Sequence, residues 1–426
     1  MKMETYPKSV ADLIGNIKEL CVGREKWAEI FEICITNTIN TTIKRQKNGT
    51  TFVLTGDIPA MWLRDSTAQV RPYLYLADQD SEIADMISGL VQRQMEYICI
   101  DPYANAFNEE ANGMGHQSDH TELTPWIWER KYEIDSLCYP IQLSYLLWKK
   151  TGRTDHFDHN YIEAAQRILE LWKAEQIHSN SGYQFERDTE RKEDTLCNNG
   201  KGSPVGFTGM TWSGFRPSDD SCIYHYLVPS NMFASVVLRY LEEISKVVLN
   251  DIELSEKAFT LKAEIDQGIK NFAIIKNKQG KKVFAFEVDG LGNHAIMDDA
   301  NVPSLLSLPY LGYCSKDDPI YLETKRTILS DENPYYFQGK YIKGIGSSHT
   351  PKNHVWPIAL SIQGLVSNSK EEKEEILNLL TTVDAGTGMM HESINIDNPE
   401  IYTREWFSWA NMMYCELLLS YFDMVI

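Results

Sequence analysis

Apolar residues recur every three or four positions through most of the chain, a spacing that is typical of amphipathic helices. The first such pattern runs from about residue 21 to residue 39 and places Trp27, Ile30, Phe31 and Cys34 on one face. Further helices are expected after residue 66, around 83–90, from 135, over 161–177 and 229–249, from 255, on both sides of 315–318 and of 367–370, and over 405–421. The pattern therefore predicts about twelve helices.

Two short stretches are typical of β-hairpins. Asn48-Gly49 separates residues 42–45 from residues 52–54, and this dipeptide favours a tight turn between two strands. A second hairpin is expected around residues 276–286. The predicted helices are joined alternately by short turns and by long loops, at about 101–134, 178–228, 331–353 and 383–404.

If consecutive helices are antiparallel neighbours, the short turns lie on one face of the molecule and the long loops on the other. Six helix pairs closed into a ring would form an all-α (α/α)6 barrel, with the long loops and small hairpins at one mouth. Closed toroids can hold this length as one unit, so we expect residues 1–426 to form a single (α/α)6 domain. The alternative is an open helical solenoid, whose loops would follow a ridge.

Each long loop ends in polar residues, many beside an aromatic one, just before a helix. The segments are Trp62-Leu63-Arg64-Asp65, Tyr132-Glu133-Ile134-Asp135, Arg216-Pro217-Ser218-Asp219-Asp220, Asp298-Asp299-Ala300-Asn301, His354-Val355-Trp356 and Tyr402-Thr403-Arg404-Glu405. Asp65, Asp135 and Asp299 could equally be helix N-caps. Caps do not account for the neighbouring Arg and Trp residues. If the six segments converge, they form a deep polar pocket, in which Asp135, Arg216 and Arg404 are candidate ligand contacts.

Asp220 and Glu392 are the candidate catalytic pair. Hydrolysis of an acetal needs one carboxyl group that protonates the departing oxygen and another that activates water or attacks directly. Asp219 would raise the pKa of Asp220, as an acid requires, whereas Arg216 would oppose this if it paired with Asp220. Glu392 follows a glycine-rich stretch and two methionines, which argues against a solvated surface side chain.

Composition narrows the classes of ligand. The net charge is −19, which argues against nucleic acid and anionic membranes, since both bind a basic surface. The chain has 10 Trp, 22 Tyr and 15 Phe, many of them beside acids in loops, an arrangement that suits sugar rings unless these residues only fill the core.

Targeting and redox signals point to the cytoplasm. The eight cysteines are scattered without CxxC spacing, and there is no apolar leader and no apolar run of membrane-spanning length. We therefore expect a cytoplasmic protein with reduced thiols, and a monomer.

Other catalytic motifs are missing from the sequence. There is no P-loop, no GxGxxG opening a helix, no GxSxG and no HExxH. His116-Gln117-Ser118-Asp119-His120 could be part of a metal site, but contacts to sugar hydroxyls or plain loop polarity are favoured because no thiol accompanies it. We expect no cofactor and no metal.

Four segments resemble glycoside hydrolase family 125, the exo-α-1,6-mannosidases of bacteria and fungi. They are residues 57–66, 215–220, 298–303 and 391–393. The resemblance implies an (α/α)6 barrel and an inverting mechanism without metal. It also implies release of mannose from the non-reducing end of α-1,6-linked mannosides, as in N-glycan fragments.

The same resemblance implies roles for individual residues. Asp220 would be the general acid and Glu392 the general base. The expected contacts to the terminal mannose are Trp62, Arg64 and Asp65, with Asp299, Asn301, His354 and Trp356 as further candidates. Two alternatives stay open from the residues alone: a non-catalytic carbohydrate-binding protein, or another sugar-active (α/α)6 enzyme such as an epimerase or lyase.

Overall fold

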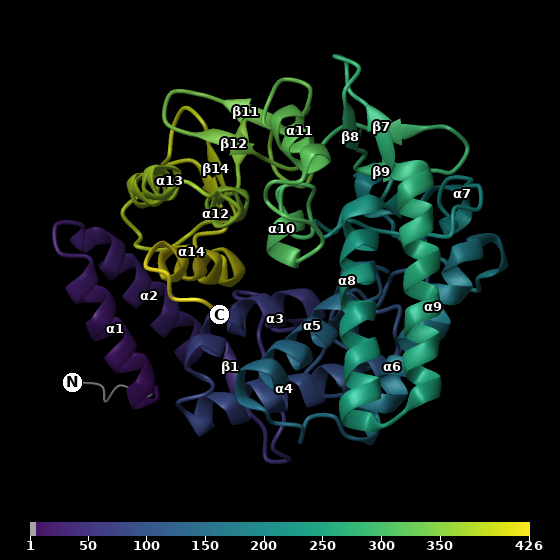
Figure 1. Cartoon of the computed structure of the whole chain (residues 1–426), viewed down its shortest axis with the longest axis horizontal. Coiled ribbons are helices and arrows are strands. Elements are labelled where there is room, and N and C mark those ends of the chain that lie inside the picture. Colours follow the sequence, from purple (N-terminus) through teal and green to yellow (C-terminus); the bar gives the residue numbers. More distant parts are fainter. Residues whose placement is uncertain (1–5) are drawn as a thin grey trace.

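Two layers of helices form a ring in the computed structural model, which describes residues 6–426 (Figure 1). The inner helices are α3 (Leu63–Val70), α5 (Ile134–Thr151), α8 (Val228–Ile244), α10 (Leu308–Leu311), α12 (Pro357–Leu365) and α14 (Ser408–Tyr421). The outer helices are α2 (Glu25–Thr41), α4 (Ser81–Ile100), α6 (His159–Ala174), α9 (Ile252–Gly268), α11 (Pro319–Ile328) and α13 (Lys370–Thr382). Outer and inner helices alternate along the chain, which confirms the predicted (α/α)6 barrel.

Burial separates the two layers. Every residue of α3 is buried, and so is every residue of α14 from Ser408 to Leu419, whereas α6 buries only one face. A helix that is buried all round belongs inside a core, and an amphipathic helix covers one. Along the inner layer, α14 packs on α3 and α12, and α5 packs on α3 and α8. One apolar cluster extends from Val10 to Met424.

Some helix boundaries differ from the predicted ones. Helix α1 (Lys8–Leu20) precedes the first predicted helix and packs on α2, although its buried residues already have helical spacing in the sequence. The second predicted helix begins earlier, at Leu63, and continues beyond Val70 as the 3-10 helix Arg71–Leu76, because Pro72 has no N–H to donate. Helix α10 has only four residues.

Shorter helical segments extend or interrupt the long ones. The π-helical turns Ser245–Leu249 and Ile269–Ala273 continue α8 and α9. The long loop after α6 contains the 3-10 helices Glu175–Asn180 and Lys192–Asp194 and the short helix α7 (Cys197–Gly200). No helix within residues 6–426 has the length and apolarity needed to cross a membrane.

Six small antiparallel sheets fix the ends of the long loops. Hairpins β1 (Ile43–Arg45)–β2 (Thr51–Val53) and β7 (Ile274–Lys276)–β8 (Lys282–Phe284) confirm the two predicted hairpins, and β11 (Tyr336–Gln338) pairs with β12 (Lys343–Ile345). The three-stranded sheets join β3 (Met61–Trp62), β4 (Ala106–Phe107) and β5 (Ile127–Glu129); β6 (Tyr226–Leu227), β9 (Glu287–Val288) and β10 (His294–Ala295); and β13 (His354–Val355), β14 (Ser393–Asn395) and β15 (Tyr402–Thr403). Strands β3, β6 and β13 run directly into or just ahead of inner helices, so the sheets hold the loop ends in register.

Candidate active site

A cavity of about 340 Å³ opens among the loops that precede the inner helices. It is lined by Thr55, Asp57, Ile58, Trp62, Arg64, Asp65, Pro217, Ser218, Asp219, Asn301, His349, Trp356, Glu392, Arg404, Phe407 and Trp409. These residues come from segments far apart in the sequence, so the long loops converge as a ring requires and do not follow a ridge. A groove of about 650 Å³ between α6 and α9 contains none of the predicted site residues.

Two adjacent aspartates face opposite ways at this cavity. Asp219 has a φ of 65°, in the left-handed region that non-glycine residues seldom adopt. It lies in a tight turn in which its N–H donates to the carbonyl of Arg216, and the N–H of Arg216 donates to the carbonyl of Asp220. Asp219 lines the cavity with 27% of its side chain exposed, whereas the side chain of Asp220 is fully buried and does not line it.

The carboxylate of Asp220 is held on the far side of the cavity wall. The Ser348 hydroxyl donates to it at 2.6 Å, and it contacts His349 Nδ1 at 3.0 Å and Arg191 Nη2 at 3.1 Å. Burial raises the pKa of Asp220, but the hydrogen bond and charge of His349 outweigh it, so the net pKa lies below the usual value. Burial alone would lower the pKa of His349. The hydrogen bond and charge of Asp220 outweigh burial, so the net pKa of His349 lies above its usual value. Asp220 therefore favours the charged form of His349, which lines the cavity.

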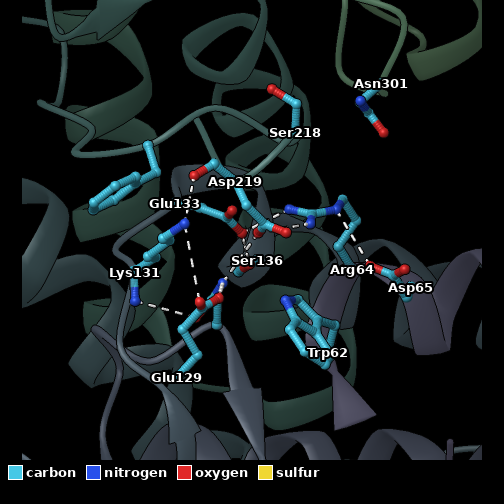
Figure 2. A network of polar contacts seen from close by, with 12 residues as sticks. Trp62, Arg64, Asp65, Glu129, Lys131, Glu133, Ser136, Ser218, Asp219 and Asn301 are labelled. Atoms are coloured by element: carbon cyan, nitrogen blue, oxygen red, sulfur yellow. Dashed lines mark hydrogen bonds and ion pairs between the residues drawn. The ribbon is translucent and has the colours of Figure 1, made fainter. Parts of the chain in front are cut away.

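Arg64 lies at the centre of the acidic wall, between Asp65 and Asp219 (Figure 2). Its Nη1 contacts Glu133 at 2.6 Å and Asp135 at 3.2 Å, its Nε contacts Asp65 at 3.4 Å, and its Nη2 contacts Asp219 at 3.6 Å. Four carboxyl groups thus surround one buried guanidinium. The sequence motif before α3 places Arg64 and Asp65 in the first turn of that helix, and the motif before α5 supplies Glu133 and Asp135.

The pKa values of these carboxyl groups diverge. Burial raises the pKa of Glu133 well above its usual value despite the opposing charge of Arg64, and it raises the pKa of Asp65 to about 6. Burial also raises the pKa of Asp135. Burial acts on Asp219 in the same direction, but Arg64 and Lys131 outweigh it, so the pKa of Asp219 is lowered overall. The buried members of the group therefore keep protons more readily than Asp219 does.

A second cation supports Asp219 from beneath. Lys131 Nζ donates to the main-chain carbonyl of Asp219 at 2.8 Å and lies 3.9 Å from Glu129. Glu129 also contacts Arg187 at 2.8 Å, and Asn105 donates to the side chain of Asp219 at 3.4 Å. The unusual turn at Asp219 is thus fixed by buried neighbours on both sides.

Glu392 reaches the cavity from the segment between α13 and α14. Its N–H donates to the carbonyl of Thr403, which ties it to the end of β15. Its carboxylate lies 3.5 Å from Arg404 Nη1, and Arg404 also forms an ion pair with Asp57. Arg404 has a φ of 44°, so the backbone is bent to bring its side chain beside Glu392.

Aromatic side chains form the rest of the wall, and two of them were predicted. Trp62 and Trp356 line the cavity together with Phe407 and Trp409. Trp356 donates from Nε1 to Thr350 at 2.9 Å and meets Phe407 edge to face. The guanidinium of Arg64 lies 5.6 Å from the centre of the Trp409 ring. Flat apolar faces beside charged groups suit a sugar ring.

Four further predicted residues do not line the cavity. Asp135 lies behind Arg64, and Arg216 pairs with buried Glu287 at 2.6 Å and not with Asp220. Asp299 accepts hydrogen bonds from the hydroxyls of Ser218 and Ser347, and His354 contacts the hydroxyl of Ser393. These side chains hold the loops that carry the lining residues. The remaining predicted residues, Trp62, Arg64, Asp65, Asn301, Trp356, Glu392 and Arg404, all line it.

The structure also shows whether Asp65, Asp135 and Asp299 are helix N-caps. Residues Trp62 and Glu133 occupy the cap positions of α3 and α5, so neither Asp65 nor Asp135 is a cap. Asp299 accepts from the N–H of Asn301 at 3.3 Å, a contact within the loop before α10.

Sequence reasoning missed other lining residues, His349, Phe407 and Trp409 among them, and it missed Glu133 beneath the cavity. His349 stands in the Ser348-His349-Thr350-Pro351 loop end, where a polar residue before a helical segment was the available signal. The His116 to His120 stretch forms ion pairs within the loops: buried Asp119 pairs with Arg187, and exposed His120 lies 3.5 Å from Asp188. Within residues 6–426 no three His, Cys, Asp or Glu side chains gather as a metal site would require.

The fold and the acid-lined cavity define the class. The barrel is similar to glucoamylase from Saccharomycopsis fibuligera, with a TM-score of 0.56 at 14% identity over 95% of this chain and 96% of that one. That likeness concerns the fold alone, and it places the chain among proteins with the (α/α)6 barrel of glycosidases.

The sequence profile of the metal-independent α-mannosidases, glycoside hydrolase family 125, matches residues 24–419. The chain belongs to this family. A Streptococcus pneumoniae α-mannosidase, solved as a non-productive substrate complex with α-1,6-mannobiose, is 56% identical, with a TM-score of 0.97 over 99% of this chain and 100% of that one. The meiotically up-regulated gene 157 protein of Schizosaccharomyces pombe is 38% identical over 97% of this chain and 86% of its own length.

Proposed function

We propose that this protein is an exo-acting α-1,6-mannosidase that releases the non-reducing terminal mannose with inversion. The observation that carries the proposal is that the carboxyl groups of Asp219 and Glu392 line one cavity of about 340 Å³. This volume lies at the low end of ligand pockets, which run from about 300 to 1,000 Å³, and it suits a terminal sugar. The α-1,6-mannobiose held by the Streptococcus pneumoniae relative supports the linkage.

In this proposal Asp219 is the general acid and Glu392 the general base. Asp219 takes the role that the sequence assigns to Asp220, because the carboxylate of Asp220 is buried behind the wall and engaged by Ser348 and His349. Asp219 gives a proton to the glycosidic oxygen as its bond to the anomeric carbon breaks. Glu392 takes a proton from the water that attacks the opposite face, so the first product is β-mannose. Such a mechanism needs carboxyl groups about 6.5–9.5 Å apart.

The substrate class extends this proposal. The relative's structure is described in connection with the processing of N-linked glycans, so mannosides from N-glycans are the proposed substrates. The cytoplasmic location and the monomeric state stay predictions from the sequence.

Substitution of the three acids tests the assignment. Asp219→Asn and Glu392→Gln should each lower kcat on α-1,6-mannobiose by about 10²–10⁴-fold, since each keeps its shape and loses its proton transfer. Asp220→Asn should retain clearly more activity, because the carboxylate of Asp220 does not line the cavity and is engaged by Ser348, His349 and Arg191. Proton NMR of the first anomer released, over a panel of α-mannobioses, checks linkage and inversion.

Two results would contradict the assignment. Loss of activity in Asp220→Asn with near-normal turnover in Asp219→Asn would return the acid role to Asp220. Release of α-mannose first would exclude inversion.

A further inference from the structure

Glu133 lies directly beneath the cavity and contacts the acidic residue that faces it. We infer that Glu133 stores the proton that Asp219 delivers, so that the two side chains act together as one acid. The inference rests on the proposed role of Asp219. Glu133 does not line the cavity and its side chain is fully buried, so it acts through Asp219 as a positioning residue and proton store.

The balance of charge requires a stored proton. Arg64 contacts Asp65, Glu133, Asp135 and Asp219. Within residues 6–426, no other Lys or Arg forms an ion pair with Glu133 or Asp135. Glu133 and Asp135 thus share the one positive charge of Arg64, which does not compensate two buried carboxylates, because each uncompensated buried ion costs several kcal/mol. At least one of these carboxyl groups is therefore protonated.

The hydrogen bonds of Glu133 place that proton on its free oxygen. Its Oε2 receives Arg64 Nη1 at 2.6 Å and the hydroxyl of Ser136 at 2.8 Å. Its Oε1 is buried and meets no donor among residues 6–426. A protonated Oε1 needs an acceptor instead of a donor, and the carboxylate of Asp219 lies within hydrogen-bond reach. Figure 2 shows the three side chains of Arg64, Glu133 and Asp219 directed toward one another.

The groups around the pair favour this distribution in the empty cavity. Arg64 and Asp135 face Glu133, while Arg64, Lys131 and His349 face Asp219. Arg64, Lys131 and His349 each act to lower the pKa of Asp219, whose side chain also keeps contact with solvent. Burial raises the pKa of Glu133 well above its usual value, in agreement with the orphaned oxygen.

Bound sugar would then move the proton. A sugar ring over Asp219 displaces the water that solvates its carboxylate, and this favours its neutral form. The O–H bond at Glu133 Oε1 breaks and an O–H bond forms on Asp219, which passes the proton to the glycosidic oxygen as the C–O bond breaks. Glu133 is left as a carboxylate held by Arg64 and Ser136. The pair regains one proton from solvent, and Glu392 releases to solvent the proton it took from water.

Infrared spectroscopy tests the stored proton without any activity. Wild-type protein at pH 7 should show the C=O stretching bands of protonated buried carboxyl groups, and Glu133→Gln should remove one of them. Glu129→Gln is the matched control: it lies in the same buried network, where burial acts against Lys131 and Arg187 and the pKa of Glu129 is lowered overall, so this variant should keep every band. An unchanged set of bands in Glu133→Gln would overturn the inference.

Kinetic measurements test whether the proton of Glu133 reaches the glycosidic oxygen through Asp219. Loss of the pair's shared proton should set the basic limb of the kcat/KM profile on α-1,6-mannobiose. Glu133→Gln should move this limb to lower pH and lower kcat/KM at pH 7 by about tenfold or more. It should keep most of its rate on 2,4-dinitrophenyl α-mannoside, whose leaving group needs no proton. Equal losses on both substrates would indicate a merely structural role and overturn the inference.

The wild-type protein alone gives a third comparison, which is independent of whether the variant folds. The infrared band should titrate at the same pH as the basic limb, and a band that titrates elsewhere would contradict the shared proton. Normal hydrolysis of mannobiose by Asp219→Asn would instead show that the proposed function is wrong, whatever the infrared result.

Discussion

At the scale of the residue, Arg64 decides whether the acidic wall can exist. It is almost fully buried and contacts four carboxyl groups, two of which have no other cation within ion-pair distance among residues 6–426. Removal of one partner from a buried ionic group leaves uncompensated charge. Stability and catalysis therefore depend on the same side chain.

We predict that Arg64→Met lowers the free energy of unfolding at pH 7 by about 3–5 kcal/mol. Without the cation, the folded-state pKa values of Asp65, Glu133 and Asp135, which burial already raises above their usual values, rise further. Stability from such groups is present below the unfolded pKa and is lost as the pH rises, so the deficit should shrink at pH 5. Urea unfolding of both proteins at pH 7 and pH 5 measures this.

The control is Arg153→Met, which removes ion pairs to Asp85 and Asp155 at the surface. This substitution should lower the free energy of unfolding by about 1 kcal/mol or less, with little dependence on pH. A deficit in Arg64→Met that is equal at the two pH values would contradict the explanation by buried charge.

The residue scale is also where the sequence was least informative. The motif that ends in Asp219-Asp220 reaches the cavity, but only the φ of 65° at Asp219 decides which carboxylate faces it. No periodicity encodes that turn, because it is fixed by Asn105, just before β4, and Lys131, just after β5, both far from it in the sequence. Glu133 stands two residues before Asp135, but nothing in its spacing shows that its side chain reaches Arg64 beneath the cavity.

At the scale of the element, the loop after α6 is held by a neutral imidazole. His225 Nδ1 contacts the carbonyl of Ser213 at 2.9 Å, and Nε2 accepts from the N–H of Ser203 at 2.8 Å. Its ring stacks on Trp212. A proton on Nε2 would break the bond to Ser203, and burial lowers the pKa of His225 from 6.5 to about 4.

We predict that His225 makes the protein less stable in mild acid. Because its folded pKa is lowered, the unfolded chain takes up the proton first as the pH falls below 6.5. Its contribution should fall by up to about 3 kcal/mol by pH 4. Asparagine can adopt the same backbone conformation as His225. The His225→Asn variant should be less stable than wild type at pH 7, and its free energy of unfolding should change less with pH. Urea unfolding across this range gives the comparison.

Exposed His294 supplies the matched control. His294→Asn should follow the wild-type dependence of stability on pH. If stability changed with pH equally in His225→Asn and wild type, the role of the buried ring would be contradicted.

The helices and strands themselves were partly predictable from the sequence: apolar spacing located most helices, and Asn48-Gly49 located a hairpin. A helix was predicted before residue 315, but inner helix α10 has only four residues, too few for a period to show its bounds, and its place depends on packing against α8.

At the scale of the whole molecule, the ring closes where its first outer helix, α2, meets its last two helices. Helix α2 packs on both α13 and α14. Trp27 donates to Asn378 at 3.1 Å, its carbonyl accepts from Tyr414 at 3.0 Å, and Arg24 pairs with Glu374 at 2.7 Å. This seam lies between the segment that carries Glu392 and the segment that leads to Trp62, so it sets one wall of the cavity against the other.

We predict that Trp27→Ala weakens the seam before it weakens the rest of the barrel. Loss of a buried Trp should cost about 3–5 kcal/mol, and opening of the seam would displace Glu392 from Asp219. In rising urea, hydrolysis of α-1,6-mannobiose should therefore disappear at a lower concentration than the helical circular dichroism signal. Trp148→Ala, in half-buried packing at the end of α5, should destabilise the protein while both signals fall together. Coincident transitions in Trp27→Ala would show that the ring unfolds as one cooperative unit, with the seam no weaker than the remainder.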